Sequence, residues 1–298
     1  MPYGTVFRPG LFAGETIIVT GAGSGIGRCT AHELAALGAN VVLVGRNHEK
    51  LDRVQAEIIE DGGKADIQVL DIRIEEDVIA AIDMIVGRDG PVYGLVNNAG
   101  GQFPARLEDI SQKGWETVVR TNLTGGFLVA REVFNQCMKA QGAGAIVNIT
   151  ADHWMSMPTM GHSGAARAGM ENFTMTAAVE WGRFGIRVNG VAPGWIASSG
   201  FDTYDGETRK TIRTLAKHVP IARLGREAEV AAAIVFLLSP GAAYITGTCI
   251  RVDGAAPNMP HNYALPEGPG NQHFAGFHRE TLPKVLSETD ETDKTDDD

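Results

Sequence analysis

The sequence predicts an α/β fold: a single doubly wound domain in which helices cover both faces of a seven-stranded parallel sheet. Short runs rich in β-branched residues alternate with longer helical patterns, which is typical of parallel sheets with crossover helices. The runs are apolar almost throughout, as expected for strands that are buried on both faces. A glycine-rich turn also joins the first run directly to the first helical pattern.

Seven runs are expected to form the strands: Thr16–Thr20, Val41–Val44, Ile67–Leu70, Gly94–Asn97, Ala145–Thr150, Ile186–Val191 and Cys249–Val252. The helical patterns between them are Gly25–Leu37, Glu49–Glu60, Glu75–Val86, Gly114–Met138, Ser163–Arg183 and Ala228–Leu238. Each run is short and each pattern is long enough for several helical turns, so the order of the two kinds of element is unambiguous.

Two segments fall outside this alternation. Ser198–Gly225 is irregular in composition, and we expect a mobile helical insertion that closes as a lid over the substrate. Trp195 and Phe201 are expected to lie near the bound substrate. The domain should therefore span residues 1–254 of the 298, and residues 255–298 form a C-terminal extension. We expect its first half to pack on the surface or on a neighbouring subunit. Its acidic end should be disordered, because like charges repel.

Composition excludes several classes of protein. The net charge of −10 argues against nucleic acid as a partner, and no uncharged apolar run is long enough to span a membrane. Cys29, Cys137 and Cys249 lie far apart in the sequence, so we expect buried, reduced thiols and no metal site. The amino terminus does not resemble a secretory signal and the carboxyl terminus is not a peroxisomal address, so we expect a cytoplasmic protein.

The glycine-rich turn, TGAGSGIG, lies between the first strand and the first helix. Glycine lets the backbone turn tightly and approach a pyrophosphate, and a helix amino terminus offers free N–H groups to an anion. This order of elements predicts a dinucleotide site. The residues expected to line it are Gly21, Ser24, Gly25, Ile26 and Gly27.

The end of the second strand indicates which dinucleotide is bound. An acidic residue there would repel a 2′-phosphate, whereas this chain has Arg46, a cation suited to that phosphate, and Arg28 adds positive charge nearby. The predicted cofactor is NADP(H). Asp71, at the end of the third strand, is expected either to accept from the adenine amino group or to cap a helix.

Further motifs complete a pattern: Asn97-Asn98-Ala99-Gly100 after the fourth strand, Asn122 in the following helix, and Asn189 with Pro193-Gly194 around the sixth strand. Together with TGAGSGIG, they resemble the short-chain dehydrogenase/reductase superfamily from about Gly14 to Gly254. The resemblance implies a Rossmann domain, in dimers or tetramers. It also implies that Asn98, Ala99 and Gly100 lie beside the adenosine, that Asn122 is catalytic, and that the loop with Pro193, Gly194 and Ile196 holds the nicotinamide.

The chain departs from this superfamily at its usual Tyr-x-x-x-Lys motif. No tyrosine occurs between Tyr93 and Tyr204, and the alignment places Ser163 and Arg167 at the two positions. Spacing i, i+4 keeps both on one face of a helix. Serine is a poor proton donor, but it can hydrogen-bond a developing oxyanion, and Arg167 can hold the nicotinamide ribose. The resemblance further implies a catalytic hydroxyl near Thr150, with Ala151 as the other alignment.

The segment His162–Gly169 resembles the corresponding helix of peroxisomal trans-2-enoyl-CoA reductases, and the broader group includes 2,4-dienoyl-CoA reductases. The resemblance implies NADPH-dependent reduction of a carbon–carbon double bond in an acyl-CoA, with no nucleic acid or membrane partner. Asp152 and His153, in the loop after the fifth strand, could supply the Cα proton through water, and the identity of the donor stays open. Two alternatives stay open: an alcohol or ketone oxidoreductase acting on a terpenoid, steroid or 3-oxoacyl substrate, and a non-catalytic NADP(H)-binding protein.

Overall fold

The computed structural model describes residues 3–204, 206–260, 262, 264–266, 268 and 270–286. The acidic end of the extension, predicted to be disordered, lies outside these residues. Within them, no helix is long and apolar enough to cross a membrane.

A seven-stranded parallel sheet forms the centre of the molecule, in the order β3-β2-β1-β4-β5-β6-β7. The strands are β1 Thr16–Thr20, β2 Asn40–Gly45, β3 Lys64–Val69, β4 Val92–Asn97, β5 Gly144–Ile149, β6 Ile186–Pro193 and β7 Cys249–Val252. All seven predicted strands are present. The order reverses between β1 and β4, and a crevice for a ligand is expected at the carboxyl ends of strands at such a switch point.

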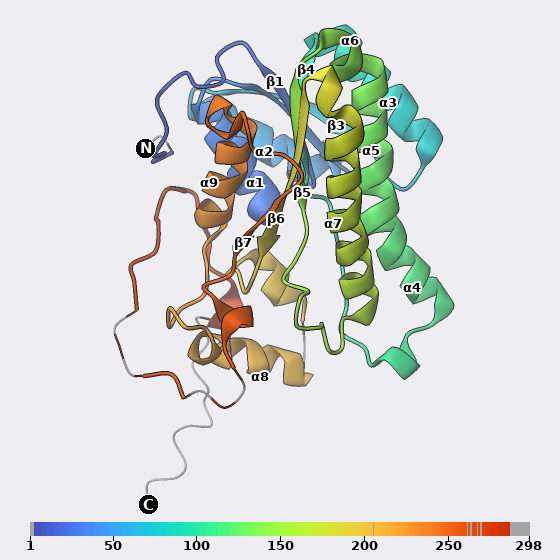
Figure 1. Cartoon of the computed structure of the whole chain (residues 1–298). Coiled ribbons are helices and arrows are strands. Elements are labelled where there is room, and N and C mark those ends of the chain that lie inside the picture. Colours follow the sequence, from blue (N-terminus) through green and yellow to red (C-terminus); the bar gives the residue numbers. More distant parts are fainter. Residues whose placement is uncertain are drawn as a thin grey trace, which may run out of the picture.

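Helices cover both faces of the sheet, with α1, α2 and α9 on one side and α3, α5 and α7 on the other (Figure 1). Their bounds are α1 Gly25–Ala36, α2 His48–Glu60, α3 Glu75–Asp89, α4 Gln112–Val119, α5 Gly125–Val133, α6 Lys139–Gln141, α7 Gly161–Trp181, α8 Gly206–Thr214 and α9 Glu227–Leu238. The predicted doubly wound fold is therefore confirmed.

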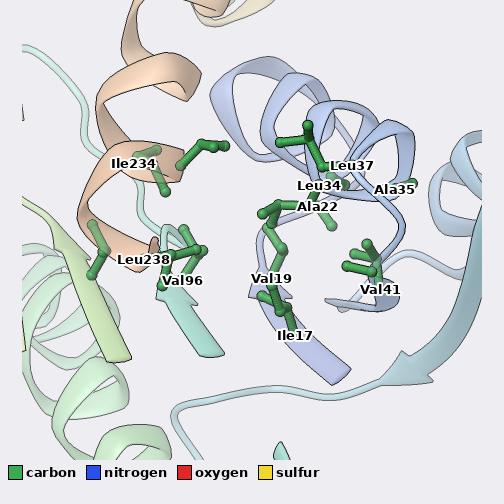
Figure 2. Packing of buried hydrophobic residues seen from close by; sticks show 14 of the residues in the cluster. Ile17, Val19, Ala22, Leu34, Ala35, Leu37, Val41, Val96, Ile234 and Leu238 are labelled. Carbon is green, nitrogen blue, oxygen red and sulfur yellow. The ribbon is translucent and has the colours of Figure 1, made fainter. Parts of the chain in front are cut away.

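The core between the sheet and the first helical layer is built from fully buried aliphatic side chains of β1, α1 and α9 (Figure 2). Ile17 and Val19 alternate with Ile18, which faces the opposite helical layer, so every side chain of β1 is buried. This explains why the strand is apolar throughout and why the sequence shows no polar alternation. The packing fixes the glycine-rich turn at the end of β1.

The long helix predicted over Gly114–Met138 is interrupted twice. Two π-helical turns, Arg120–Thr124 and Phe134–Met138, separate α4, α5 and α6. Each turn inserts a residue into the helical repeat, and such insertions often occur at functional sites. The first turn contains Asn122, whose side chain is buried.

The segment after β6 and the C-terminal extension form a small second core. Phe201, Ile212 and Leu215 pack against Val285, which is fully buried. Phe277 and Val285 of the extension thus pack on the protein's own surface, and the backbone N–H of Val285 donates to Asp202 at 3.1 Å. Phe201 points into this core and is only 9% exposed, and its predicted place near the substrate stays a prediction.

Candidate functional site

The glycine-rich turn is locked against the end of β4. Gly21 has a φ of +66°, and a Cβ there would lie 2.9 Å from the Cα of Ala99. A Cβ on Gly27 would collide with the side-chain amide of Asn98, which itself donates to the carbonyl of Thr20 at 2.9 Å. Side chains are excluded at both glycines, so the backbone stays open to a ligand at the amino terminus of α1.

The first turn of α1 offers uncommitted N–H groups. Ser24 is the exposed N-cap residue, yet its side chain makes no capping hydrogen bond, and the first turn holds no acidic residue. Gly25 begins the helix with a φ of +58°, and Ile26 packs against the core. An anion such as a pyrophosphate can therefore accept directly from this helix end.

Arg46 and Arg28 differ sharply in what surrounds them. Arg46 is exposed just beyond β2 and has no ion pair among the described residues. The guanidinium of Arg28 instead binds Glu57 at 2.8 Å and lies over the ring of Phe277, 4.9 Å from its centroid. Arg46 is thus available to a 2′-phosphate, whereas the positive charge that Arg28 adds near the turn is shared with Glu57.

Asp71 is already committed to a neighbour. Both of its carboxylate oxygens accept hydrogen bonds from the Arg73 guanidinium, the shortest at 2.6 Å, and this holds the pKa of Asp71 below its usual value. The N-cap of α3 is Ile74, so Asp71 does not cap that helix. The Asp71 carboxylate instead accepts from the backbone N–H of Arg73 at 3.1 Å. An adenine contact would have to share this carboxylate with Arg73.

Arg167, on α7, projects beneath the turn that follows β4. Its Nη1 donates to the carbonyl of Ile149 at 2.6 Å, and its Nη2 lies against Gly100, where any Cβ would collide with it. The Nε is buried without a hydrogen-bond partner among the described residues. Burial lowers the pKa of Arg167 to about 10. A buried guanidinium with an unused donor requires an acceptor, and ribose hydroxyls satisfy this requirement.

Ser163 lies one turn before Arg167 on α7 and is fully buried. Its hydroxyl donates to the side-chain carbonyl of Gln102 at 2.6 Å and accepts from the amide of Asn122 at 3.4 Å. Asn122 also exchanges two hydrogen bonds with the backbone of Gly101, at 2.8 and 3.0 Å. The structure therefore brings Asn122 and Ser163 together. Arg167 lies against Gly100, the neighbour of the Gly101 that binds Asn122.

Gln102 and Tyr204 are the residues that sequence reasoning missed. Gln102 is exposed, and its Nε2 donates to the Tyr204 hydroxyl at 3.2 Å. The available signals were the position of Gln102, two residues after Gly100, and the place of Tyr204 as the first tyrosine after Tyr93. Neither signal reveals that the two residues meet.

Thr150 does not join this cluster. Its hydroxyl lies 3.2 Å from the carbonyl of Val191 and 3.3 Å from the thiol of Cys249, and its side chain is buried there. Among the described residues it makes no hydrogen bond to Ser163 or Arg167. The Thr150 hydroxyl is oriented toward β6 and β7, and its assignment as a catalytic hydroxyl stays a prediction.

The loop after β6 passes close to the end of β7. Pro193 ends β6, and a Cβ on Gly194 would lie 2.8 Å from the Cα of Asp253, so only glycine fits. Ile196 is buried and forms an isolated bridge to Gly225. The loop is thus held in place on both sides, as a backbone that positions a planar ligand group would require.

Asp152 and His153 follow β5 in the same region. One carboxylate oxygen of Asp152 is buried without a partner among the described residues, and burial together with nearby Asp253 raises the pKa of this carboxyl. His153 is paired with Glu171 at 2.7 Å, which limits its freedom to serve as a proton donor.

Taken together, these residues fit a nicotinamide dinucleotide. The glycine turn and the open end of α1 suit a pyrophosphate, and the unpartnered Nε of Arg167 suits a ribose. The family model described as enoyl-(acyl carrier protein) reductase matches residues 21–255. A probable 2,4-dienoyl-CoA reductase of Bacillus subtilis (strain 168) is 37% identical over 245 residues, which cover 80% of this chain and 95% of that protein.

Solved structures agree with this assignment. The citronellol catabolism dehydrogenase AtuB of Pseudomonas aeruginosa PAO1 is 63% identical, with a TM-score of 0.77, over 85% of this chain and 99% of that chain. A variant of actinorhodin polyketide ketoreductase, solved with NADPH, is 32% identical with a TM-score of 0.78, over 85% of this chain and all of that chain. The chain therefore belongs to the short-chain dehydrogenase/reductase superfamily and is an oxidoreductase of that type.

Proposed function

We propose that the protein catalyses NADPH-dependent reduction of the carbon–carbon double bond of an enoyl thioester, such as a trans-2-enoyl-CoA. The observation that carries the proposal is the pair Ser163 and Arg167 on one face of α7, where the resemblance implies a tyrosine and a lysine. The hydroxyl and the guanidinium can bind and stabilise charge, but neither is a ready proton donor at neutral pH.

Conjugate reduction suits such a pair. The cofactor, when bound, supplies a hydride for Cβ of the substrate. Negative charge then collects on the thioester oxygen, where the Ser163 hydroxyl can donate a hydrogen bond, as it now does to Gln102. Asn122 orients that hydroxyl from the other side, and Arg167 is positioned to hold the nicotinamide ribose.

The preference for NADPH rests on Arg46. Its exposed guanidinium beyond β2 has no ion pair among the described residues and can bind a 2′-phosphate. A charge-assisted hydrogen bond contributes about 1.5–3 kcal/mol, enough for roughly ten- to a hundredfold in affinity.

A second candidate follows from the 63% identity to AtuB, which is described as a dehydrogenase of citronellol catabolism. Citronellol is a terpenoid alcohol, so the alternative is an NADP(H)-dependent alcohol or ketone oxidoreductase acting on a terpenoid, with steroid or 3-oxoacyl substrates as variants. A cytoplasmic location, an acyl-CoA partner and assembly into dimers or tetramers stay predictions.

One substrate comparison separates the two candidates. NADPH oxidation is followed by absorbance with crotonyl-CoA, 2-decenoyl-CoA and acetoacetyl-CoA, and NADP⁺ reduction is followed with citronellol. The proposal expects the enoyl thioesters to have the highest kcat/KM. Faster turnover of acetoacetyl-CoA or citronellol would overturn it in favour of the alternative.

A further inference from the structure

Tyr204 reaches the Ser163 cluster from a distant part of the chain. It follows the 3-10 helix Ser199–Thr203 and precedes α8, and its side chain is half-buried. Its hydroxyl accepts the side-chain amide of Gln102 at 3.2 Å, and its own proton has no acceptor among the described residues. A phenol therefore lies beside the site even though α7 carries none.

The side chain of Gln102 bridges two hydroxyl groups. Its carbonyl accepts from Ser163 at 2.6 Å and its amide nitrogen donates to Tyr204 at 3.2 Å. Since the oxygen and nitrogen of one amide are about 2.3 Å apart, the two hydroxyl oxygens lie within about 8 Å of each other. The amide of Gln102 thus lies between the two hydroxyls, in the place that a substrate carbonyl would take. Gln102 is exposed, and its hydrogen bonds to other described residues are made by its side-chain tip, so a substrate can displace it.

The backbone that carries Tyr204 is held by packing. The ring lies against the small core of Phe201, Ile212, Leu215 and Val285. The extension fastens this core through two contacts of Val285, from its N–H to Asp202 at 3.1 Å and from Arg213 to its carbonyl at 3.2 Å. Tyr204 is thus positioned by chain elements that the superfamily pattern of motifs does not include.

We propose that Tyr204 is a catalytic residue that donates the proton which completes the reduction, in place of the tyrosine missing from α7. The inference rests on the proposed function. Hydride transfer to Cβ leaves an electron pair shared between Cα and the thioester oxygen. The Ser163 hydroxyl donates a hydrogen bond to that oxygen. That pair forms the new Cα–H bond with the proton of the Tyr204 hydroxyl, and the O–H electrons remain on the phenolate. Water reprotonates the phenolate at its open side, so one proton from solvent is consumed in each turnover.

Asp152 is the rival donor, and its surroundings separate it from this cluster. Its unpartnered oxygen is buried near Asp253 and Arg251, on the β7 side. Among the described residues it makes no hydrogen bond to Ser163, Asn122 or Gln102. Asp152→Asn is therefore a direct competitor in the test, because the two proposals predict opposite rankings of the variants.

The test compares Tyr204→Phe with Tyr244→Phe, which removes the hydroxyl of a fully exposed tyrosine. With crotonyl-CoA, Tyr204→Phe should lower kcat by about 10²-fold or more, the range for loss of a general acid. NADPH affinity should stay unchanged, and Tyr244→Phe should match the parent.

The outcomes separate the two proposals. If the parent reduces acetoacetyl-CoA and not crotonyl-CoA, the proposed function fails. Tyr204→Phe is then measured on acetoacetyl-CoA, where a phenol would protonate the carbonyl oxygen and the same loss is expected. If Tyr204→Phe keeps kcat within about threefold on the parent's best substrate, while Asp152→Asn loses about 10²-fold, Tyr204 is not the proton donor.

Discussion

The hydroxyl of Ser163 donates a 2.6 Å hydrogen bond to the side-chain carbonyl of Gln102. The serine is fully buried and Asn122 approaches its oxygen at 3.4 Å, so the direction of the donated proton is fixed. An oriented donor that is already desolvated costs little to reorganise when charge develops beside it. A substrate carbonyl that takes the place of the Gln102 carbonyl would meet this donor directly.

Ser163→Ala should lower kcat for an enoyl thioester by about 10²–10³-fold, the usual effect of losing one such donor. The dissociation constant of NADPH should barely change, because the hydroxyl contacts Gln102 and Asn122 rather than the glycine turn. Thr150→Val is the matched control, since it also removes a buried hydroxyl, one committed to Val191 and Cys249. Similar losses of kcat in both variants would contradict the assignment.

Arg167→Ala should weaken NADPH binding as well as turnover. The proposed ribose contact is lost, and so is the 2.6 Å hydrogen bond to the carbonyl of Ile149. Loss of a charge-assisted bond predicts roughly a ten- to hundredfold rise in the NADPH dissociation constant. Arg167→Lys should recover part of this, because a cation remains. Fluorescence titration of bound NADPH measures both variants, and an unchanged affinity for Arg167→Ala would remove the ribose role.

The fold was predictable because each strand is a run of apolar residues, which indicates a buried strand without reference to the rest of the chain. β1 and β7 were bounded correctly, since their apolar runs end at the residues where pairing ends. β3 begins at Lys64, three residues earlier than predicted, because its edge position lets polar residues pair with β2. The π-helical turn at Asn122 was missed because no residue type marks it.

The site was predictable only where one local segment contains the signal. The glycine turn and the pair Ser163 and Arg167 each lie in a single element, so the glycine spacing predicted the turn and the resemblance to the superfamily predicted the pair. Contacts between segments that are distant in the sequence have no local pattern that could have predicted them. Gln102 meets Tyr204 across 102 positions, and Phe277 covers Arg28 from the far end of the chain. Only the folded chain brings these partners together.

Arg46→Asp should abolish the preference for NADPH over NADH. The parent is expected to bind NADPH roughly ten- to a hundredfold more tightly than NADH, and the variant should lose that ratio because a carboxylate repels the 2′-phosphate. Arg183→Asp makes the same change of charge at an exposed position beyond α7 and controls for the net charge of the protein. Equal affinities of the parent for the two cofactors would end this argument.

The buried carboxyl of Glu227 should make stability depend on pH. Burial raises its pKa from 4.5 to about 7, against the opposing charge of Arg28. Between these values the folded state keeps a proton that the unfolded state has lost, so the free energy of unfolding falls as pH rises from about 5 to 7.5. Glu227→Gln should flatten this slope and gain about 1–3 kcal/mol over the parent at pH 8.

Urea unfolding at several pH values checks this prediction. Glu229→Gln on the same helix should behave oppositely. Although burial opposes ionisation of Glu229, its hydrogen bonds hold its pKa below the usual value, the shortest being 2.6 Å from Arg223. That variant should be less stable than the parent at neutral pH. A parent whose stability does not fall between pH 5 and 7.5 would contradict the role given to Glu227.

The central claim is that the hydride is transferred to Cβ of an enoyl thioester and not to a carbonyl carbon. Isotopic labelling of one turnover tests this claim most directly. Crotonyl-CoA is reduced in D₂O with unlabelled NADPH, and the product is examined by mass spectrometry and NMR. The account predicts butyryl-CoA with one solvent deuteron at Cα and unlabelled hydrogen added at Cβ. No saturated product from crotonyl-CoA, together with rapid conversion of acetoacetyl-CoA to its 3-hydroxy product, would contradict the account.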